Sequence, residues 1–367
     1  MEKQSSFRFL LYPFALLYGI GVWIRNLLFD GNILSSKQFS IPVICVGNLA
    51  AGGTGKTPMI EYLIHLLKDK YRIAVLSRGY KRKSSGYILA DRDSTPWLVG
   101  DESYQIKSRY PDVMVAVDED RCRGICNLLN MNEDVRPQII LLDDAFQHRY
   151  VQPSFSILMT DYNRLYYRDK LLPAGRLRES AGNVRRTNIV VVSKCIESLK
   201  PIERCIIEKE MKLKTYQRLF FSTISYQPLE GVFPDRCGTL KLEHIRKDDE
   251  ILLLTGIANP KPLIEKMIAY SDKVKAISFP DHHDYTGKDI RKIRTELSHM
   301  KSDKPLIICT EKDAVRLRSN PHVPDEWKTH LYAVPIRMEF LSGTDRQFDE
   351  QILRHIHLIE TSKILQQ

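Results

Sequence analysis

The chain has 367 residues, and 55 lysines and arginines against 45 aspartates and glutamates give it a formal net charge of +10. Hydrophobic residues make up 43% of it and glycine and proline number only 18 each, which excludes collagen-like, low-complexity and wholly disordered chains. The length predicts two domains, each large enough to bury a core. The positive charge suits nucleic acid, an anionic membrane surface or phosphorylated substrates, and composition does not choose among them.

The seven cysteines are scattered along the sequence, with no C-x-x-C pair and no Cys/His ladder at zinc spacing. We therefore expect neither a disulfide framework nor a structural metal. A reducing, cytosolic setting fits this pattern best.

An uncharged apolar tract, residues 9–24, lies near the N-terminus between Arg8 and Arg25. It is shorter than the roughly 20 residues of a spanning helix, and no small-residue cleavage site of a signal peptide follows it. We interpret residues 1–30 as a monotopic, membrane-associating helix, with Trp23 suited to the headgroup boundary. A helix packed on the protein's own core is the alternative.

Short apolar runs then alternate with helical patterns. Most of these runs are continuously apolar, as expected for strands buried on both faces of a parallel sheet. Together with the helical stripe at 58–67, they predict a mostly parallel, doubly wound α/β/α domain over residues 31–220. The predicted strands are residues 41–46, 72–76, 113–117, 138–142, 155–159 and 188–192.

The remainder of the chain has the same alternation on a smaller scale. A charged helical stretch at 196–214 and a linker strand at 219–226 lead into it. We predict a smaller α/β/α domain over residues 221–367 that contributes to the active-site cleft and ends in a helix at 349–359. Its predicted strands are residues 250–254, 274–279, 306–309 and 331–336, with a helix at 261–270.

A glycine-rich loop is the most specific local signal. It directly follows the strand at 41–46 and opens the helix at 58–67, which is the setting that a phosphate-binding loop requires, although Ala50 replaces the first glycine of the usual pattern. Backbone N–H groups bind phosphate oxygens, the lysine reaches the β- and γ-phosphates, and the following threonine binds Mg²⁺. The predicted nucleotide-binding residues of this P-loop are Gly52, Gly53, Thr54, Gly55, Lys56 and Thr57.

Paired carboxylates follow another buried strand. Residues 138–142 are apolar and run directly into Asp143 and Asp144. At the end of a strand neighbouring the P-loop, one of the two is placed to hold Mg²⁺, directly or through water. A helix cap or a solvated turn is the alternative. The sequence does not decide which carboxylate contacts the metal.

Six motifs occur in the same order as in a known enzyme family. They are VGNLAAGGTGKTP, SRGYKRK (77–83), GDE (100–102), DDAFQH (143–148), AGRLRES (174–180) and FPDHHDYT (279–286). Together they resemble the tetraacyldisaccharide 4′-kinases, the lipid A 4′-kinases of outer-membrane biogenesis. The resemblance covers nearly the whole chain after the N-terminal tract, with Ala145 in place of a common glycine.

The resemblance implies an ATP- and Mg²⁺-dependent kinase that phosphorylates the 4′-hydroxyl of tetraacyldisaccharide 1-phosphate. A glycolipid substrate explains why an α/β enzyme carries a membrane-associating helix, and it implies a peripheral, monotopic location on the cytoplasmic face of the inner membrane. An anionic membrane surface accounts for the basic excess, and no nucleic-acid partner is expected. The basic residues within 78–83 fit this role and an ordinary solvated surface equally well.

The resemblance also assigns roles to single residues. It makes Asp101 the base that orients the acceptor hydroxyl and takes its proton, with Glu102 beside it. A histidine of the PDHH motif assists the aspartate, and we choose His282 over His283. Domain closure would bring Asp101 and His282 together.

Four further residues match positions that the family places near the nucleotide and metal. Arg178 would balance charge on the γ-phosphoryl group, and Glu179 would contact Mg²⁺ or its waters. Gln147 and His148 belong to the same neighbourhood, where His148 would contact the metal shell or a phosphate. A salt bridge beside a helix and a simple turn are the alternatives for these two pairs.

Two other functions share the phosphate loop. A membrane-tethered GTPase switch usually needs an Asn/Thr-Lys-x-Asp motif after a late strand, and residues 193–196 read SKCI without the aspartate. An ATP-driven or nonenzymatic adaptor would have no function for the GDE and PDHH motifs. The kinase accounts for more of the motifs.

Overall fold

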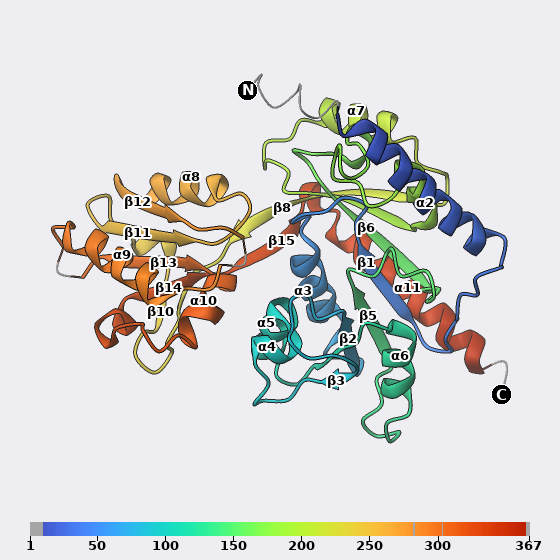
Figure 1. The fold of residues 1–367 in the computed structure, drawn as a ribbon, viewed down its shortest axis with the longest axis horizontal. Helices are drawn as coiled ribbons and strands as arrows, with labels where there is room; N and C mark the ends of the chain where they lie inside the picture. The colour runs from blue at the N-terminus through green and yellow to red at the C-terminus, as the bar shows by residue number, and fades with distance from the viewer. Residues whose placement is uncertain (1–9, 282, 303, 365–367) are drawn as a thin grey trace. The chain divides into compact units, whose positions relative to one another are not determined.

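The computed structural model describes residues 10–281, 283–302 and 304–364. The chain divides into two compact units: the first ends at Ile224 and resumes at Met338, and the second spans Ser225–Arg337 (Figure 1). Strands β8 (Arg218–Tyr226) and β15 (Ile336–Phe340) carry the chain out of the first unit and back into it.

A nine-stranded, mostly parallel sheet forms the centre of the first unit, in the order β15-β8-β7-β6-β1-β5-β2-β4-β3. The pairs from β8 to β4 are parallel, and β3 is antiparallel to β4. This arrangement confirms the predicted α/β fold class. The other strands are β1 (Val43–Gly47), β2 (Ile73–Ser77), β3 (Ile88–Leu89), β4 (Met114–Val117), β5 (Ile139–Asp143), β6 (Phe155–Asp161) and β7 (Ile189–Ser193).

Alternate side chains of these strands pack into cores on opposite faces of the sheet. On β1, Ile44 and Val46 join the core that contains the apolar stripe of α3, whereas Val43 and Cys45 join the core beneath α6. Helices on both faces therefore explain why the strands read as unbroken apolar runs. The helices of this unit are α2 (Tyr12–Asp30), α3 (Lys56–Leu67), α4 (Pro96–Val99), α5 (Asp101–Arg109), α6 (Arg121–Leu129), α7 (Pro201–Met211) and α11 (Asp345–Ile364).

The C-terminal segment belongs to the first unit. Helix α11 buries Phe348, Ile352 and Ile356 completely in the same core as α3. The sequence-based boundary at residue 221 instead assigns residues 338–367 to the smaller domain. The segment predicted as a linker strand is β8, which pairs with β7 in the sheet of the first unit. Pro335 separates β14 from β15, so the single strand predicted at 331–336 is two strands in two different sheets.

The second unit contains a six-stranded sheet in the order β10-β9-β14-β13-β11-β12. Four of its strands are parallel, and β9 and β10 add an antiparallel edge. Its strands are β9 (Leu229–Gly231), β10 (Thr239–Leu240), β11 (Glu250–Thr255), β12 (Lys273–Ser278), β13 (Leu306–Thr310) and β14 (Leu331–Val334), and its helices are α8 (Lys261–Tyr270), α9 (Gly287–Ser298) and α10 (Glu311–Arg318).

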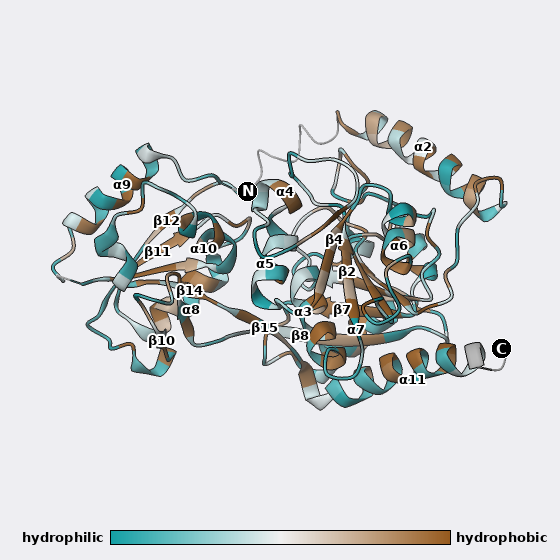
Figure 2. Cartoon of the chain, turned by 90° about the horizontal axis from the view of Figure 1, so that it is seen from below, coloured by the Kyte–Doolittle hydropathy of each residue, from teal (hydrophilic) through white to brown (hydrophobic). Residues whose placement is uncertain are grey.

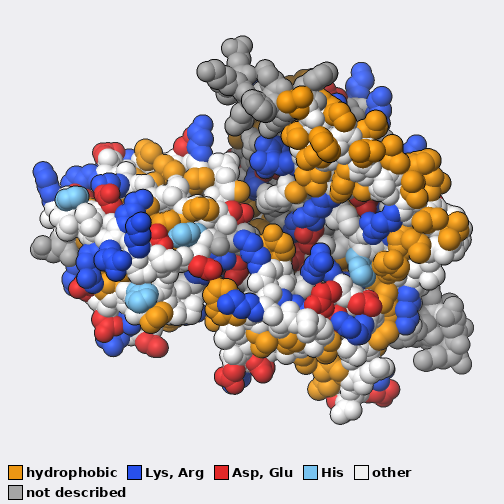
Figure 3. Space-filling view, in the orientation of Figure 1, with side chains coloured by type: hydrophobic (Ala, Val, Ile, Leu, Met, Phe, Trp, Pro, Cys, Tyr) orange, Lys and Arg blue, Asp and Glu red, His pale blue; other side chains and the backbone are white. Residues whose placement is uncertain are grey.

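Helix α2 carries its apolar residues outward. Leu16 and Trp23 are 67% and 63% exposed, and only Ala15, Asn26 and Phe29 are buried. Figures 2 and 3 show this helix as an apolar surface along one side of the first unit. Within the part of the chain that the structure describes, α2 is the one helix long and apolar enough, by length and composition, to cross a membrane. Packing on the protein's own core therefore does not account for its apolar face.

Candidate active site

The predicted site residues follow the carboxyl ends of adjacent parallel strands. In the sheet register Val46 of β1 lies beside Asp143 of β5, and Leu142 lies beside Leu76 of β2. The P-loop after β1, the carboxylates after β5 and the segment after Ser77 therefore share one edge of the sheet, the usual place for a ligand in this architecture.

The P-loop has the backbone that its glycines predict. Gly52 and Gly55 have φ angles of 118° and 81°, which side-chain-bearing residues rarely adopt. Inside the loop, the buried amide of Asn48 donates to the Thr54 hydroxyl over 2.8 Å and holds the loop closed. Lys56 is the first residue of α3, at the helix end where the dipole adds partial positive charge, and its ammonium group lies 3.6 Å from Asp144.

The end of β7 supports the P-loop from outside. The Ser193 hydroxyl donates to the Thr54 carbonyl over 2.8 Å, and the Lys194 ammonium donates to the Gly53 carbonyl. Lys194 also pairs with Asp161 at 2.9 Å. Sequence reasoning considered these two residues only as part of a guanine-recognition motif, although their position after a buried parallel strand was the signal that could have placed them at the site.

Asp144 lies between two cations. Nη1 of Arg178 is 3.0 Å from both carboxylate oxygens of Asp144, and Nζ of Lys56 is 3.6 Å from Oδ1. Burial works against ionisation of Asp144, but Lys56 and Arg178 outweigh it and hold its pKa below the ordinary value. Asp144 is thus a stable carboxylate that orients both cations.

Asp143 has the opposite environment. Its side chain is buried, and its Oδ1 has no hydrogen-bond partner among the described residues. Burial raises the pKa of Asp143 to about 7, and the negative charges of Asp144 and Glu102 add to the effect against the attraction of Lys56. A buried carboxylate oxygen that lacks a partner among the described residues, at the strand end next to the P-loop strand, has the chemistry of a Mg²⁺ ligand.

The GDE motif places two carboxylates at the start of α5. Gly100 has a φ of 85°, and Asp101 and Glu102 are the first two residues of the helix, where its dipole stabilises negative charge. The Ser103 hydroxyl lies 2.6 Å from that of Ser77, which fixes this helix start to the end of β2. Because Leu76 of β2 pairs with Leu142 of β5, this helix start lies at the sheet edge that carries Asp143, and the negative charge of Glu102 helps to raise the pKa of Asp143.

The DDAFQH turn is tied to the loop and to a buried arginine. The Gln147 amide donates to the Asn48 carbonyl over 2.7 Å. Burial, reinforced by the positive charge of Arg121, lowers the pKa of His148 to about 4, so this imidazole is neutral at physiological pH. Arg121 is only 4% exposed, and its charge acts on both Asp143 and Asp144. Sequence reasoning missed Arg121, which follows β4 at the same sheet edge.

Asp120, Cys122 and His148 form the one metal-like cluster found among the described residues, with ligand atoms within 4.8 Å of one another. Asp120 already caps α6 by accepting from the Cys122 and Arg123 amides. The positive charge that lowers the pKa of His148 also opposes a cation here. This electrostatic environment does not favour a second metal.

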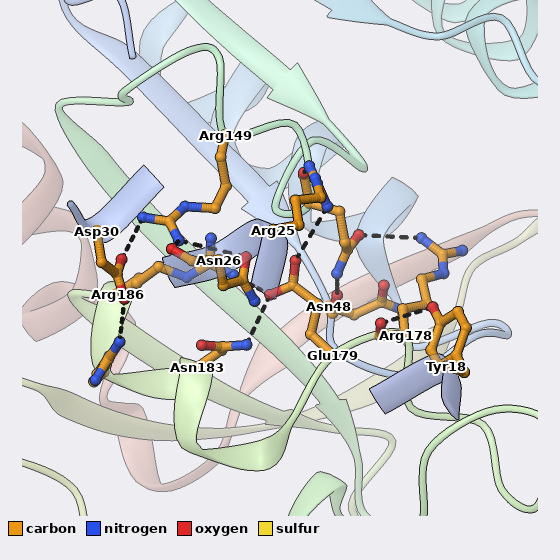
Figure 4. A network of polar contacts seen from close by, with 12 residues as sticks. Tyr18, Arg25, Asn26, Asp30, Asn48, Arg149, Arg178, Glu179, Asn183 and Arg186 are labelled. Carbon is orange, nitrogen blue, oxygen red and sulfur yellow. Dashed lines mark hydrogen bonds and ion pairs between the residues drawn. The ribbon is translucent and has the colours of Figure 1, made fainter. Parts of the chain in front are cut away.

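Glu179 points away from Arg178, toward α2 (Figure 4). Its carboxylate is 1% exposed and accepts from Arg186 and from the Asn183 amide, and Nη1 of Arg25 lies 3.9 Å away. Oε1 of Glu179 has no hydrogen-bond partner among the described residues, and burial raises the pKa of Glu179 against the attraction of Arg186 and Arg25. The predicted contact of Glu179 with Mg²⁺ therefore stays a prediction.

The PDHH motif lies in the second unit, and His282 is outside the described residues. His283 has structural contacts: its Nε2 lies 3.1 Å from Asp289, and its ring stacks on Phe279 with centroids 4.7 Å apart. Asp289 also accepts from the hydroxyl and the amide of Thr286 at the start of α9. His283 is therefore engaged by this helix cap, and the choice of His282 as the assisting histidine stays a prediction.

Comparisons with known proteins agree on one family. A family model described as tetraacyldisaccharide-1-P 4′-kinase matches residues 7–357. Tetraacyldisaccharide 4′-kinases of Parabacteroides distasonis and Flavobacterium johnsoniae are 51% and 46% identical, covering 97% and 96% of this chain and 96% and 98% of their own. A crystal structure of LpxK from Aquifex aeolicus in complex with ATP is 28% identical and has a TM-score of 0.73 over 95% of this chain and 99% of that one.

Proposed function

The chain belongs to the tetraacyldisaccharide-1-phosphate 4′-kinase family, and we propose how its own residues carry out the transfer. It phosphorylates a tetraacyldisaccharide 1-phosphate on its 4′-hydroxyl with ATP, in the biosynthesis of lipid A. The observation that carries the residue assignment is the contact of Asp144 with Lys56 and Arg178, next to Asp143, whose Oδ1 has no hydrogen-bond partner among the described residues. A switch or an adaptor is no longer needed to explain the phosphate loop.

The P-loop binds the phosphates of ATP. Backbone N–H groups of Gly52 through Thr57 donate to phosphate oxygens, and the N-terminus of α3 adds partial positive charge. Lys56 reaches the β- and γ-phosphates, and Arg178 compensates the charge that develops on the transferring group. Asp144 holds both cations in place before the nucleotide arrives, so little reorganisation is needed.

Thr57 and Asp143 are the residues that would hold Mg²⁺. The unpartnered, buried Oδ1 of Asp143 fits a metal ligand better than the oxygens of Asp144, which Arg178 and Lys56 already engage. When bound, Mg²⁺ neutralises charge on the β- and γ-phosphate oxygens.

Asp101 is the proposed general base. The substrate's 4′-oxygen attacks the γ-phosphorus, the bond from that phosphorus to the ADP oxygen breaks, and the hydroxyl proton passes to the Asp101 carboxylate. Because phosphoryl transfer has a loose transition state, the carboxylate mainly orients the hydroxyl and takes its proton late. Asp101 and Glu102 lie in the first turn of α5, where the helix dipole favours negative charge, and His282 is the proposed assisting group.

Helix α2 is proposed to lie in the bilayer interface at the cytoplasmic face of the inner membrane. One side of α2 exposes Leu16 and Trp23, while the other is tied to the site loops through Arg25 and Asp30 (Figure 4). A helix that keeps these polar contacts is held against the first unit, and this favours a monotopic helix over a spanning one. The negatively charged surface of the membrane also attracts this chain, because its formal net charge is +10.

The test is transfer of ³²P from γ-labelled ATP to tetraacyldisaccharide 1-phosphate in detergent micelles. Wild type should form labelled lipid, and Lys56→Ala should lose at least about 10²-fold in kcat while remaining folded. Lys209→Ala, which removes an exposed lysine on α7, is the matched control and should be fully active. Full activity of Lys56→Ala would remove the phosphate-loop assignment.

A further inference from the structure

A second surface of the first unit combines exposed aromatic and basic side chains. Tyr80 and Trp97 are 58% and 50% exposed, and Leu98 beside them is 38% exposed. Lys81 and Lys83, also exposed, complete the set. These five residues, called the α4 patch below, come from the loop after β2 and from the short helix α4.

Hydrogen bonds and a ring contact hold the two segments of the α4 patch together. The Lys83 amide donates to the Trp97 carbonyl over 2.8 Å, and the Ser84 hydroxyl donates to the Leu98 carbonyl over 2.6 Å. The Lys83 ammonium lies 4.3 Å from the centroid of the Trp97 ring. Arg82, in contrast, is turned inward onto Glu119 at 2.8 Å. Arg82 therefore has a structural role, whereas Lys81 and Lys83 are exposed to solvent.

This composition matches the interface of an anionic bilayer. Trp and Tyr combine an apolar ring with a polar group and concentrate at the headgroup level, and lysines nearby gain from the negative surface potential. We propose that the α4 patch is a second membrane-docking surface that contacts anionic lipid headgroups together with α2. The proposal rests on the membrane association proposed above for α2, and it adds a contact that the helix alone does not provide.

The α4 patch lies next to the proposed base, Asp101, along the chain. Helix α4 ends at Val99, and α5 begins with Asp101, so Gly100 alone separates the two helices. A Cβ on Gly100 would lie 2.9 Å from the Tyr80 carbonyl oxygen. The backbone next to Asp101 is therefore closely packed against the loop that carries Tyr80. In the view of Figure 2, α4 and α2 both lie toward the upper side of the first unit. Docking there brings the headgroup layer, where the disaccharide lies, toward Asp101.

Tryptophan fluorescence distinguishes the two surfaces. The full chain has three tryptophans: Trp23 on α2, Trp97 in the patch, and Trp327, which is 3% exposed. In Trp23→Phe, vesicles of phosphatidylcholine and phosphatidylglycerol with brominated acyl chains should shift Trp97 emission to the blue and quench it. In Trp97→Phe, the same vesicles report on Trp23. The double variant gives the baseline of the buried Trp327.

Quenching of both tryptophans supports the proposal. Quenching of Trp23 alone would overturn the α4 patch and leave the α2 anchor intact, whereas quenching of neither would overturn both. Quenching of Trp97 only after the glycolipid substrate is added would assign the patch to the substrate instead of the bilayer and would also overturn the proposal.

The charge contribution is tested separately. Lys81→Glu with Lys83→Glu should weaken partitioning onto phosphatidylglycerol vesicles by more than about 30-fold, the factor for the loss of two lysines alone, with little change on pure phosphatidylcholine. Lys209→Glu with Lys214→Glu makes the same change in net charge at exposed positions outside the patch and should have a much smaller effect. Equal losses in the two pairs would show a nonspecific charge effect and contradict a docking role for these lysines.

Discussion

Nη1 of Arg178 lies 3.0 Å from each carboxylate oxygen of Asp144, while the adjacent Asp143 buries an oxygen that has no partner among the described residues. Two consecutive carboxylates therefore have opposite electrostatics: the pKa of Asp144 is lowered, and that of Asp143 is raised to about 7. Asp144 organises the cations of the site, and Asp143 is left to bind a cation from solution. The predictions below follow from this division.

Asp143→Asn should stabilise the metal-free protein at pH 8 by about 1–3 kcal/mol and abolish transfer. The pKa of Asp143 is raised from 3.8 to about 7 by folding, so its contribution to stability is full below about pH 4 and is lost as the pH rises through 7. The gain in Asp143→Asn should accordingly shrink from pH 8 to pH 5. Urea unfolding in the presence of EDTA at pH 8 and pH 5 measures the free energy of unfolding of wild type and variant. If Asp143→Asn were less stable than wild type at pH 8, Asp143 would not be a destabilising buried charge.

Arg178→Ala should lower kcat by about 10²–10³-fold because it removes a donor placed for charge that develops in the transition state. Arg178→Lys should recover part of the loss, since it keeps the charge without the guanidinium geometry. Steady-state kinetics with varied ATP separates kcat from KM. Arg218→Ala, at an exposed arginine of β8, is the control. An effect confined to the KM for ATP would make Arg178 a ground-state binding residue only.

Glu179→Gln should destabilise the fold by about 2–4 kcal/mol, because Arg186 would remain buried without its carboxylate. The Mg²⁺ concentration for half-maximal activity should stay unchanged. Glu210→Gln, at an exposed pair with Arg168, should have a much smaller effect on stability, because solvent screens that pair. A large shift in the Mg²⁺ requirement with unchanged stability would restore the metal role that the sequence suggested for Glu179.

The two sides of α2 should be separable by mutation. Leu16→Ser with Trp23→Ser removes exposed apolar area and should move the protein to the soluble fraction while activity on micellar substrate is largely kept. Arg25→Ala loses the bond to the Gln147 carbonyl and should retain membrane binding but lower kcat about tenfold through a displaced DDAFQH turn. Membrane association that survives the first variant unchanged would disprove the anchor.

The sequence was sufficient to predict the elements of the site that depend on local pattern. A glycine-rich loop between a strand and a helix, and acids directly after an apolar strand, are positioned by the rule that parallel strands end at one edge, which is why Lys56 and Asp143 were placed correctly relative to β1 and β5. The register then brings Asp144 and Lys56 to within ion-pair distance.

Long-range packing explains what the sequence did not reveal. Nothing local distinguishes Phe340 and Phe348 from core residues of the second unit, yet they pack with Phe220 in the first. Glu179 likewise sits one residue from Arg178, and only the tertiary fold shows that the two side chains serve different networks. Arg25 contacts residues more than 100 positions away, which no local motif encodes.

The most direct measurement is single-turnover transfer from γ-labelled ATP to micellar tetraacyldisaccharide 1-phosphate by Asp101→Asn and wild type, with ATP affinity measured in parallel. Asn keeps the size and helix position of Asp101 but cannot accept the proton. We predict a fall in the transfer rate of about 10²–10⁴-fold with ATP affinity unchanged. A variant that transfers phosphate at the wild-type rate would contradict the account, because the proposed base would then have no role in the reaction.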